Sequence, residues 1–263
     1  MQIAAEPDIE RRLYGIAGSA KLQAAHIVIV GIGGVGSWAA EALARNAVGA
    51  ITLIDLDNIA ESNVNRQIHA IDGAFGKAKV TAMRERLLSI NPSCQVCEIE
   101  DFVTSENITQ LLNFKCDLII DCIDDTQAKL ALAIFCSAQN TPLIMAGSAG
   151  GRLDPTRIQV ADLANVTGDK LLAKVRNQLR RDHQFPKASN KQKSAKFNIT
   201  CVFSDEQVIK PEKLQFDEAC SLDVGQITDS ITGQSCAGYG SSVCVTAPFG
   251  FTAAQLAINL VVA

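Results

Sequence analysis

A glycine-rich turn near the N-terminus carries residue types suited to holding a phosphate. The G-x-G-x-x-G spacing follows a short apolar run, residues 26–30, and precedes an alanine-rich helical stretch. The first two glycines let the backbone turn sharply and approach a phosphate, and the third lets helix and strand pack closely. The positive end of the helix dipole attracts the anion. The residues expected to contact a nucleotide here are Gly31, Gly33, Gly34, Gly36 and Ser37.

An acidic residue follows at the spacing of a ribose ligand. Asp55 ends a second apolar run, residues 51–55, nineteen positions after Gly36. A carboxylate in this position can bind the hydroxyls of a ribose. The two runs and the helix between them therefore predict a nucleotide-binding βαβ unit, and we include Asp57 among the expected contacts.

The polar loop that follows favours ATP over a nicotinamide cofactor. It contains Asn63, Arg66 and Gln67, and Lys79 stands near the start of the next helical stretch. A nicotinamide site holds its pyrophosphate mostly through backbone N–H groups. An ATP site that expels pyrophosphate must neutralise more charge, which requires Arg, Lys and usually Mg²⁺. Lys77 stands at the same helix entry, and a solvated helix position is its alternative role.

Three carboxylates stand within or directly after the most apolar run of the chain, residues 117–124. Asp121, Asp124 and Asp125 stand at the carboxyl end of this predicted strand, which is the side of an α/β sheet where ligands bind. Hard oxygen ligands of this kind suit Mg²⁺. Helix capping or a backbone hydrogen bond is the alternative role for Asp121.

Apolar runs and amphipathic stretches alternate along the first 150 residues. This alternation predicts an α/β fold with a doubly wound, mainly parallel Rossmann-like sheet. We expect one domain over residues 1–263, with a nucleotide-binding part (1–150) and an extension (151–263) that adds an antiparallel strand at 157–161. Further predicted strands cover 95–100 and 142–146, and predicted helices cover 77–90, a stretch after Thr104, and 126–139.

Composition excludes several classes of protein. The net charge of −4 gives no general attraction to nucleic acid or anionic membranes. The nine cysteines are odd in number and several fall inside predicted elements, which favours a reducing cytoplasm over a disulfide framework. Cys94 and Cys97 have metal-ligand spacing, but no second C-x-x-C pair completes a zinc site, so no zinc is expected. The N-terminus lacks the pattern of a secretory signal.

The extension contains a basic insert, residues 169–196, with nine Lys or Arg against two Asp. Leu171, Leu172, Val175 and Leu179 predict one apolar stripe on a helix within it. A solvated helix face followed by a loop at 186–196 is one interpretation. A local basic arm for RNA is the other.

The last 34 residues, after Asp229, contain no charge. About 20 apolar residues suffice to span a bilayer, so a membrane segment has to be considered. Pro248, many small residues and the lack of flanking Lys or Arg favour a buried core helix over residues 247–262 instead. Peripheral membrane association stays open.

The motifs together resemble the ubiquitin-activating-type adenylating enzymes, the ThiF/MoeB/HesA superfamily. They occur in the order G-I-G-G-V-G-S, L-I-D-x-D, N-x-N-R-Q, G-x-x-K and D-C-I-D. The resemblance implies that Asp55 holds the ribose and that Arg66 and Lys79 hold the triphosphate. It also implies that Asp124 binds Mg²⁺ and orients the phosphates. Arg12 resembles an arginine that reaches across a homodimer into the partner's site, and Arg11 is the alternative.

Within the superfamily, the whole chain is similar to the bacterial tRNA threonylcarbamoyladenosine dehydratases. The segments that carry this likeness are 148–156, 201–206 and 235–240. The likeness implies ATP-dependent dehydration of a threonylcarbamoyl-modified adenosine beside the tRNA anticodon, through a carboxyl adenylate that is captured within the same side chain. Cys236 is a candidate for a transient thioester or sulfur relay, with apolar packing as the alternative. A monovalent cation in the glycine loops stays open.

Two other functions compete with this one. The first is adenylation of the C-terminus of a ubiquitin-like sulfur carrier, or a role in sulfur relay with a sulfur-transfer partner. The second is a nucleotide-binding scaffold or redox protein without adenylation, against which Arg66 and Lys79 argue.

Overall fold

The computed structural model describes residues 8–187, 195–209 and 239–263. Its centre is a seven-stranded sheet with the order β3-β2-β1-β4-β5-β7-β6. All neighbouring pairs are parallel except β6 and β7, which are antiparallel. The strands are β1 His26–Val30, β2 Ala50–Ile54, β3 Gln95–Ile99, β4 Leu118–Asp121, β5 Leu143–Ala146, β6 Ile158–Asp162 and β7 Ile199–Ser204. The predicted doubly wound, mainly parallel sheet with an antiparallel extension is confirmed.

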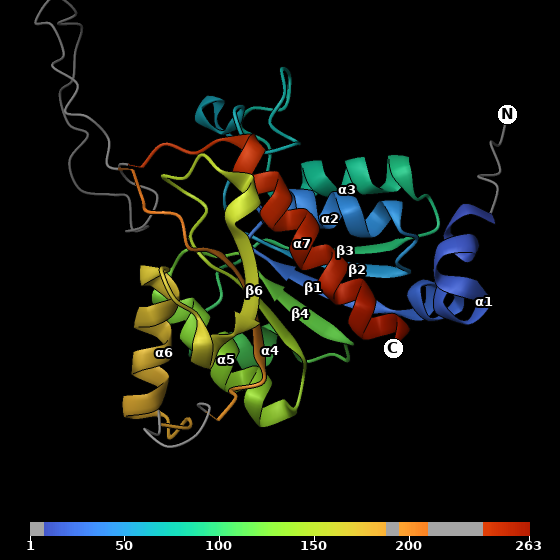
Figure 1. Cartoon of the computed structure of the whole chain (residues 1–263). Helices are drawn as coiled ribbons and strands as arrows, with labels where there is room; N and C mark the ends of the chain where they lie inside the picture. Colours follow the sequence, from blue (N-terminus) through green and yellow to red (C-terminus); the bar gives the residue numbers. More distant parts are fainter. Residues whose placement is uncertain (1–7, 188–194, 210–238) are drawn as a thin grey trace, which may run out of the picture.

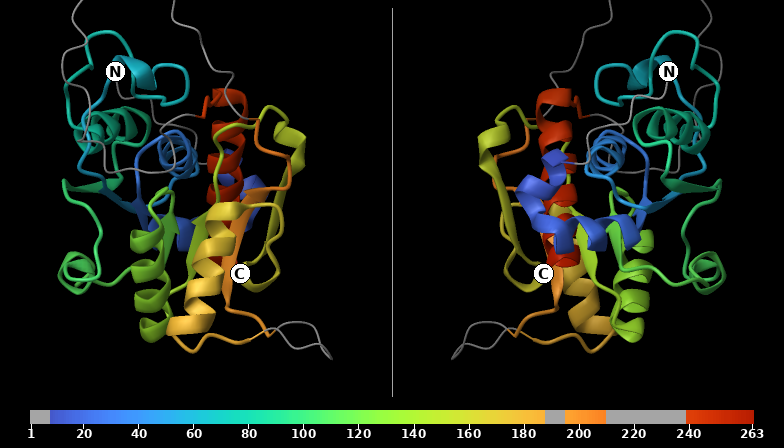
Figure 2. Two further views of the ribbon diagram at one scale, coloured as in Figure 1. Left: turned by 90° about the vertical axis from the view of Figure 1, so that its left-hand side faces the viewer. Right: turned by 90° about the vertical axis from the view of Figure 1, so that its right-hand side faces the viewer.

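Helices cover both faces of the sheet (Figures 1 and 2). The helices are α1 Asp8–Ala24, α2 Gly36–Arg45, α3 Lys79–Ile90, α4 Ile108–Leu111, α5 Thr126–Gln139, α6 Lys170–Asp182 and α7 Val243–Val262. Short 3₁₀ turns occur at η1 Glu61–Asn63, η2 Pro155–Arg157 and η3 Leu163–Asn165. One core cluster joins α2, α3 and α7 to the sheet, and a second joins α4, α5 and α6 to its other face.

The central strands have no polar face, because both sides are covered. Along β1, Ile27 and Ile29 belong to the first core cluster, and Val28 and Val30 belong to the second. Such strands consist of continuous apolar runs, which explains why sequence alone located β1, β2, β4 and β5 well.

Several predicted boundaries were wrong. The helix predicted from residue 77 begins at Lys79, because Ala78 is extended and forms a bridge to Asn58. The strand predicted over 117–124 ends at Asp121, and the following residues turn toward the sheet edge. Helix α1 and strand β7 were not predicted at all.

Helix α7 is longer than predicted. It begins at Val243, where the Ser242 side chain caps it by accepting a hydrogen bond from Cys244 N, and it contains Pro248. Its inner face is buried, with Val245, Phe249 and other residues fully covered.

By length and composition α7 could cross a membrane, with a mean hydropathy of 1.5, but 50% of that apolar window is buried. Figure 1 shows α7 crossing the sheet beside α2. The packing supports the expected core helix, and composition alone gives weak support for a membrane segment.

Candidate functional site

The glycine turn connects β1 to α2 at the carboxyl edge of the sheet. Gly31 has a φ of +88°, a conformation that side chains with a Cβ rarely adopt. A Cβ added at Gly36 would lie 1.9 Å from the Gly31 carbonyl oxygen. Neither position tolerates a larger residue, so the turn depends on glycine for its shape.

One position in the turn faces open space. A Cβ built on Gly33 meets no atom within 4 Å, whereas one on Gly34 would meet Arg66 Cγ at 3.2 Å and Thr246 Cβ at 3.3 Å. The turn therefore has one face open for a ligand. Its other face is packed against the polar loop and the first turn of α7.

Asp55 lies directly behind this turn, at the end of β2. Its carboxylate accepts hydrogen bonds from Ile32 N at 2.6 Å and from Asp57 N at 2.8 Å. Burial raises the pKa of Asp55, and the positive charge of Lys79 acts in the opposite direction. A carboxylate has about four acceptor positions, so capacity remains for ribose hydroxyls.

Lys79 occupies the first turn of α3 and points to the same acids. Its Nζ donates to Asp57 Oδ2 at 2.7 Å and lies 3.9 Å from Asp55 Oδ1. The lysine side chain is only 7% exposed, whereas that of Asp57 is 57% exposed. The nearly buried ammonium of Lys79 thus has its main partner, Asp57, at the solvent boundary. An anionic ligand can reach this position and replace Asp57 as the partner of Lys79.

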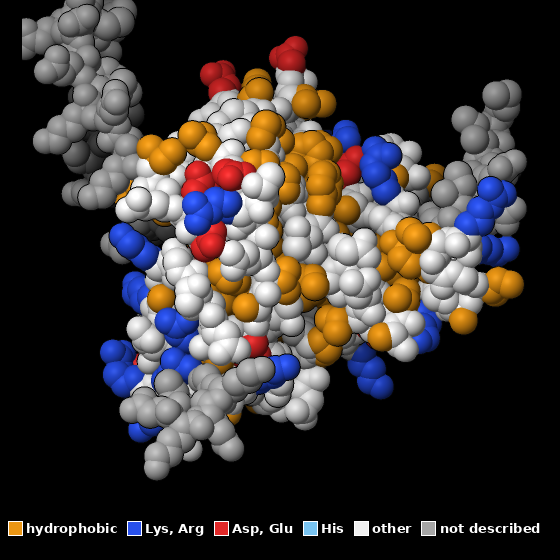
Figure 3. All heavy atoms as spheres, viewed as in Figure 1, with side chains coloured by type: hydrophobic (Ala, Val, Ile, Leu, Met, Phe, Trp, Pro, Cys, Tyr) orange, Lys and Arg blue, Asp and Glu red, His pale blue; other side chains and the backbone are white. Residues whose placement is uncertain are grey.

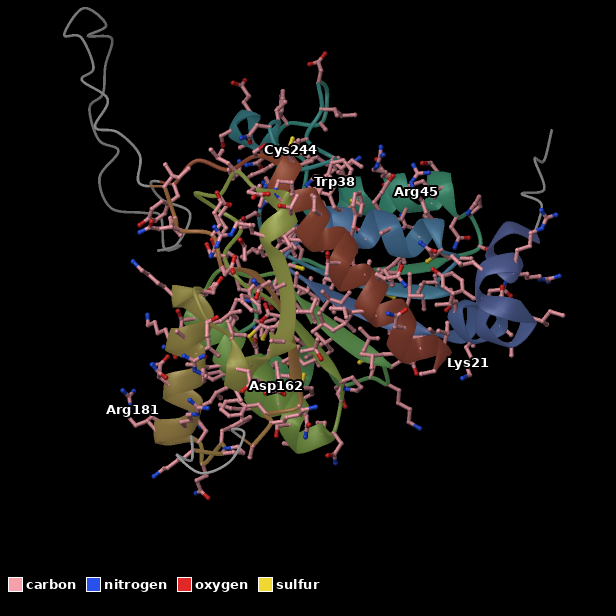
Figure 4. The ribbon with its side chains drawn as sticks, in the orientation of Figure 1. Lys21, Trp38, Arg45, Asp162, Arg181 and Cys244 are labelled. Carbon is pink, nitrogen blue, oxygen red and sulfur yellow. The ribbon has the colours of Figure 1, made fainter. Side chains whose placement is uncertain are left out.

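The polar loop is held in place from two sides. Trp38 Nε1 on α2 donates to the Arg66 carbonyl at 2.9 Å, and Asn65 Nδ2 donates to the Ser241 carbonyl at 2.7 Å. Arg66 Nη1 donates to the Ser62 carbonyl at 2.7 Å. Figure 4 labels Trp38 close to the start of α7. This anchoring places the Arg66 side chain over Gly34.

Other predicted contacts of this region are buried. Asn63 accepts a hydrogen bond from Ala60 N at 3.1 Å through Oδ1. The Ser37 hydroxyl and Gln67 Oε1 find no hydrogen-bond partner among the described residues. Both atoms are covered by protein, so they face the interior rather than the open side of the turn.

The three predicted carboxylates do not act as one group. Asp121 is fully buried, where it pairs with Lys129 Nζ at 3.1 Å and accepts from Ile123 N at 3.0 Å. Asp125 caps α5 by accepting from Ala128 N at 2.8 Å. Backbone and lysine partners therefore occupy Asp121 and Asp125, in line with the structural alternative given for Asp121, and the Mg²⁺ role of Asp124 stays a prediction. Asp124 lies between them, partly exposed, in the turn that packs against Gly31.

No group of three or more His, Cys, Asp or Glu gathers to hold a metal within the described ranges. Proteins usually bind Mg²⁺ with one or two carboxylates plus substrate phosphates and water, and the partly exposed Asp124 is a donor of the type which that ion prefers. Asp124 is the hard oxygen donor that follows the residues packed against Gly31.

The C-x-x-C pair is divided between interior and surface. Cys94 is buried and Cys97 is exposed, as strand alternation predicts.

Two predicted site residues lie away from this cluster or outside the description. Arg12 is on α1, which directly precedes β1 in the sequence and lies away from the carboxyl edge of the sheet in Figure 1. Cys236 lies outside the described residues, so its predicted role stays a prediction.

Sequence analysis missed a second set of residues at this edge. Arg152 is almost fully buried and donates to the carbonyls of Ser148 and Ser204, and its Nη2 lies 3.5 Å from Asp169 Oδ2. Asp169 also accepts from Ser148 N at 2.8 Å. This network fixes the loop after β5. The sequence feature that could have indicated this network is the single Arg152 in a glycine-rich segment.

Comparisons with known proteins agree with this geometry. The tRNA threonylcarbamoyladenosine dehydratase of Escherichia coli strain K12 is 43% identical over 253 residues, covering 96% of this chain and 91% of that protein. Its namesake in Bacillus subtilis strain 168 is 37% identical over 195 residues, covering 74% and 72%. A crystal structure of the E. coli enzyme in complex with ATP matches with a TM-score of 0.82 and 41% identity, over 96% of this chain and 91% of that one.

The ThiF family model matches residues 6–262. It therefore spans the glycine turn, the polar loop, Lys79 and α7. The resemblance to ThiF/MoeB/HesA-type enzymes is confirmed, and the chain belongs to the ThiF family.

Proposed function

We propose that this protein uses ATP to dehydrate threonylcarbamoyladenosine in tRNA, closing a ring in the modified side chain. The observation that carries the proposal is the Lys79–Asp55–Asp57 cluster beside the open face at Gly33. It supplies a cation for phosphates and an acid for a ribose in one place. The similarity to the E. coli dehydratase over 96% of the chain identifies the substrate class.

The reaction has two balanced steps. A carboxylate oxygen of the threonyl group attacks the α-phosphorus of ATP, the bond to the β-phosphate oxygen breaks, and pyrophosphate leaves. A nucleophilic atom of the same side chain then attacks the activated carboxyl carbon and releases its proton to water, and AMP leaves with the carboxylate oxygen as the ring closes. The nucleoside loses one water. Because ring closure is intramolecular, the protein mainly has to orient the chain and exclude water.

Each residue of the cluster has a specific role in this proposal. Asp55 binds the ribose while its backbone hydrogen bonds hold the turn. The amides around Gly33 approach the phosphates, and Lys79 exchanges Asp57 for the triphosphate. Arg66 adds a second cation from the anchored loop. Such preorganised charge is most effective where it stabilises the leaving pyrophosphate.

Asp124 would hold Mg²⁺ together with the phosphates. The ion supplies charge neutralisation on the leaving group when bound. The support for this assignment is that Asp124 directly follows Cys122 and Ile123, which lie against Gly31, and that Asp121 and Asp125 are committed to structural contacts.

We also propose that the whole chain acts as one adenylating unit in a cytoplasmic homodimer, with Arg12 reaching the partner's site. The support is that β6 and β7 join the same sheet as β1, and that α1 exposes Leu13 at 73% and Ile16 at 79%. Exposed apolar side chains on one helix suit a surface covered by a second copy.

The deciding experiment is mass spectrometry of tRNA nucleosides. The protein is incubated with ATP, Mg²⁺ and threonylcarbamoyladenosine-containing tRNA, and the control omits ATP. The expected result is the loss of one water from that nucleoside, only with ATP, and formation of AMP. No mass change with tRNA, together with ATP–pyrophosphate exchange on a carrier protein ending in Gly-Gly, would contradict the proposal and favour the weaker alternative.

A further inference from the structure

Helix α6 presents a stripe of cations to solvent. Lys170, Lys174 and Arg181 are all exposed, and with Asn177 they recur at the spacing of one helix face. Together with Ala173 and Gln178 they line a shallow hollow on the surface of α6. Figure 3 shows Lys and Arg gathered over this side of the molecule, and Figure 4 shows Arg181 projecting from the far end of α6.

The two other cations of α6 are used by the fold. Arg176 donates to the Val166 carbonyl. Arg180 donates to the Pro186 carbonyl at 3.1 Å and lies over the Phe197 ring at 5.3 Å. The basic helix thus divides into an inner pair that binds loop carbonyls and an outer stripe that does not.

Helix stability does not explain the two lysines of the outer stripe, whereas Arg181 stands in the last turn, where the helix dipole favours a cation. Lys170 stands in the first turn, where the helix dipole disfavours a cation, and the first turn carries no acid. Lys174 stands four residues later, so the two like charges repel each other. Among the described residues neither lysine forms an ion pair, and Arg181 pairs only with its neighbour Asp182. The two lysine charges are therefore available to an external anion, and the exposed Arg181 shares its charge with Asp182.

The stripe is fixed to the candidate site at one end. Asp169 caps α6 by accepting from Leu172 N at 2.9 Å, and the same carboxylate accepts from Ser148 N in the loop after β5. Arg152 pairs with the same oxygen, Asp169 Oδ2, at 3.5 Å. Lys170 follows directly, so the stripe starts at the carboxyl edge of the sheet. It runs about 16 Å along the helix from there to Arg181.

We propose that the α6 stripe, Lys170, Lys174 and Arg181, binds the phosphate backbone of a tRNA stem while the modified nucleoside occupies the nucleotide edge. This inference rests on the proposed function. A helical RNA is recognised largely through its phosphates and shape, and an exposed row of cations on an otherwise acidic protein matches that chemistry.

The test compares two double variants of equal charge change. K170Q/K174Q removes two stripe charges, and K21Q/K115Q removes two exposed lysines near the amino edge of the sheet. For K170Q/K174Q we expect the KM for tRNA to rise roughly tenfold at moderate salt. The slope of log affinity against log salt should fall by about 1.8, or 0.9 for each phosphate contact. The kcat at saturating tRNA and the KM for ATP should stay unchanged, and K170R/K174R should restore binding.

Other results distinguish failure of the α6 stripe proposal from failure of the proposed function. Equal KM values and salt slopes for the two double variants, with wild-type dehydration intact, would overturn the stripe and leave the proposed function standing. A wild-type protein that adenylates a carrier protein but neither binds nor changes tRNA would overturn both. Loss of kcat with an unchanged KM would also contradict phosphate docking.

Discussion

Two lysine–aspartate pairs stand at the carboxyl ends of strands that flank β1, and they differ in access to water. Lys129 and Asp121, after β4, are both 0% exposed, and Lys129 also donates to the Ala146 carbonyl at 2.7 Å. Lys79 and Asp57, after β2, lie 2.7 Å apart with the aspartate 57% exposed. The same two residue types therefore build a sealed pair and an open pair.

This difference in exposure distinguishes a pair that stabilises the fold from a pair that can bind a ligand. The sealed pair has every partner inside the protein, and Asp121 uses its second oxygen to hold the turn that leads to Asp124. The open pair can exchange its partner without moving a buried charge into an apolar environment. Only the open pair is suited to a ligand that arrives and leaves.

Breaking the sealed pair should have the largest effect on stability. Lys129→Met leaves Asp121 buried without its cation, and we expect the free energy of unfolding to fall by about 3–5 kcal/mol. Urea denaturation measures this loss. The double variant D121N/K129M carries no buried charge and should recover most of it. A K129M protein as stable as wild type would remove the distinction between the pairs.

Breaking the open pair should affect activity instead. For Lys79→Gln we expect kcat/KM for ATP to fall by roughly 10²–10³-fold, the scale of losing one preorganised cation. Loss of the pair with the exposed Asp57 should cost about 1 kcal/mol or less. Because the nearly buried Asp55 also loses a positive charge 3.9 Å away, the total fall in the free energy of unfolding should exceed that limit but stay below that of Lys129→Met. Lys77→Gln is the matched control two residues away, where Lys77 pairs with Glu85 and activity should persist. Equal losses in both variants would contradict a specific role for Lys79.

The neighbouring aspartates at the end of β4 give a finer version of the comparison. Asp124→Asn should lower turnover by at least ~10²-fold and raise the Mg²⁺ concentration needed for half activity. Asp125→Asn keeps the α5 cap, because Asn caps as well as Asp, so both activity and stability should stay near wild type. Near-normal turnover of D124N would remove Asp124 from the mechanism.

A buried histidine beside the open pair gives the smallest expected effect. His69 is 4% exposed, and burial, with Lys79 and Arg86 nearby, lowers its pKa to about 4. The folded state keeps His69 neutral while the unfolded chain binds a proton below pH 6.5. Stability is therefore lost as pH falls from about 6.5 toward 4.

Between pH 7 and pH 5 this linkage amounts to about 2 kcal/mol. Urea denaturation at both pH values should show that much less pH dependence in His69→Gln than in wild type. His183→Gln, at the exposed end of α6, is the control and should follow wild type. If the free energy of unfolding changes equally with pH in wild type and both variants, His69 is not held neutral.

Sequence patterns located the elements that bury both faces. The apolar runs of β1, β2 and β5, the G-x-G-x-x-G turn and helix α5 were predicted close to their observed bounds, whereas β4 was located correctly but predicted three residues too long at its carboxyl end. Strand β7 was missed because a six-residue apolar segment carries no periodicity that distinguishes it from loop or helix core. Its place between β5 and β6 depends on pairing that sequence alone does not encode locally.

The sequence by itself determined that a nucleotide turn, an acid after the second strand and two nearby cations occur in the order of an adenylating enzyme. The tertiary structure decided which of the charged residues remain available to a ligand. It buried Asp121 against Lys129, assigned Asp125 to a helix cap and gave the nearly buried Lys79 a partner, Asp57, at the solvent boundary. It also turned Arg176 and Arg180 inward while Lys170 and Lys174 face outward. Spacing fixes which residues share a face or a strand end, but only packing from distant segments decides whether a charge meets a buried partner or water.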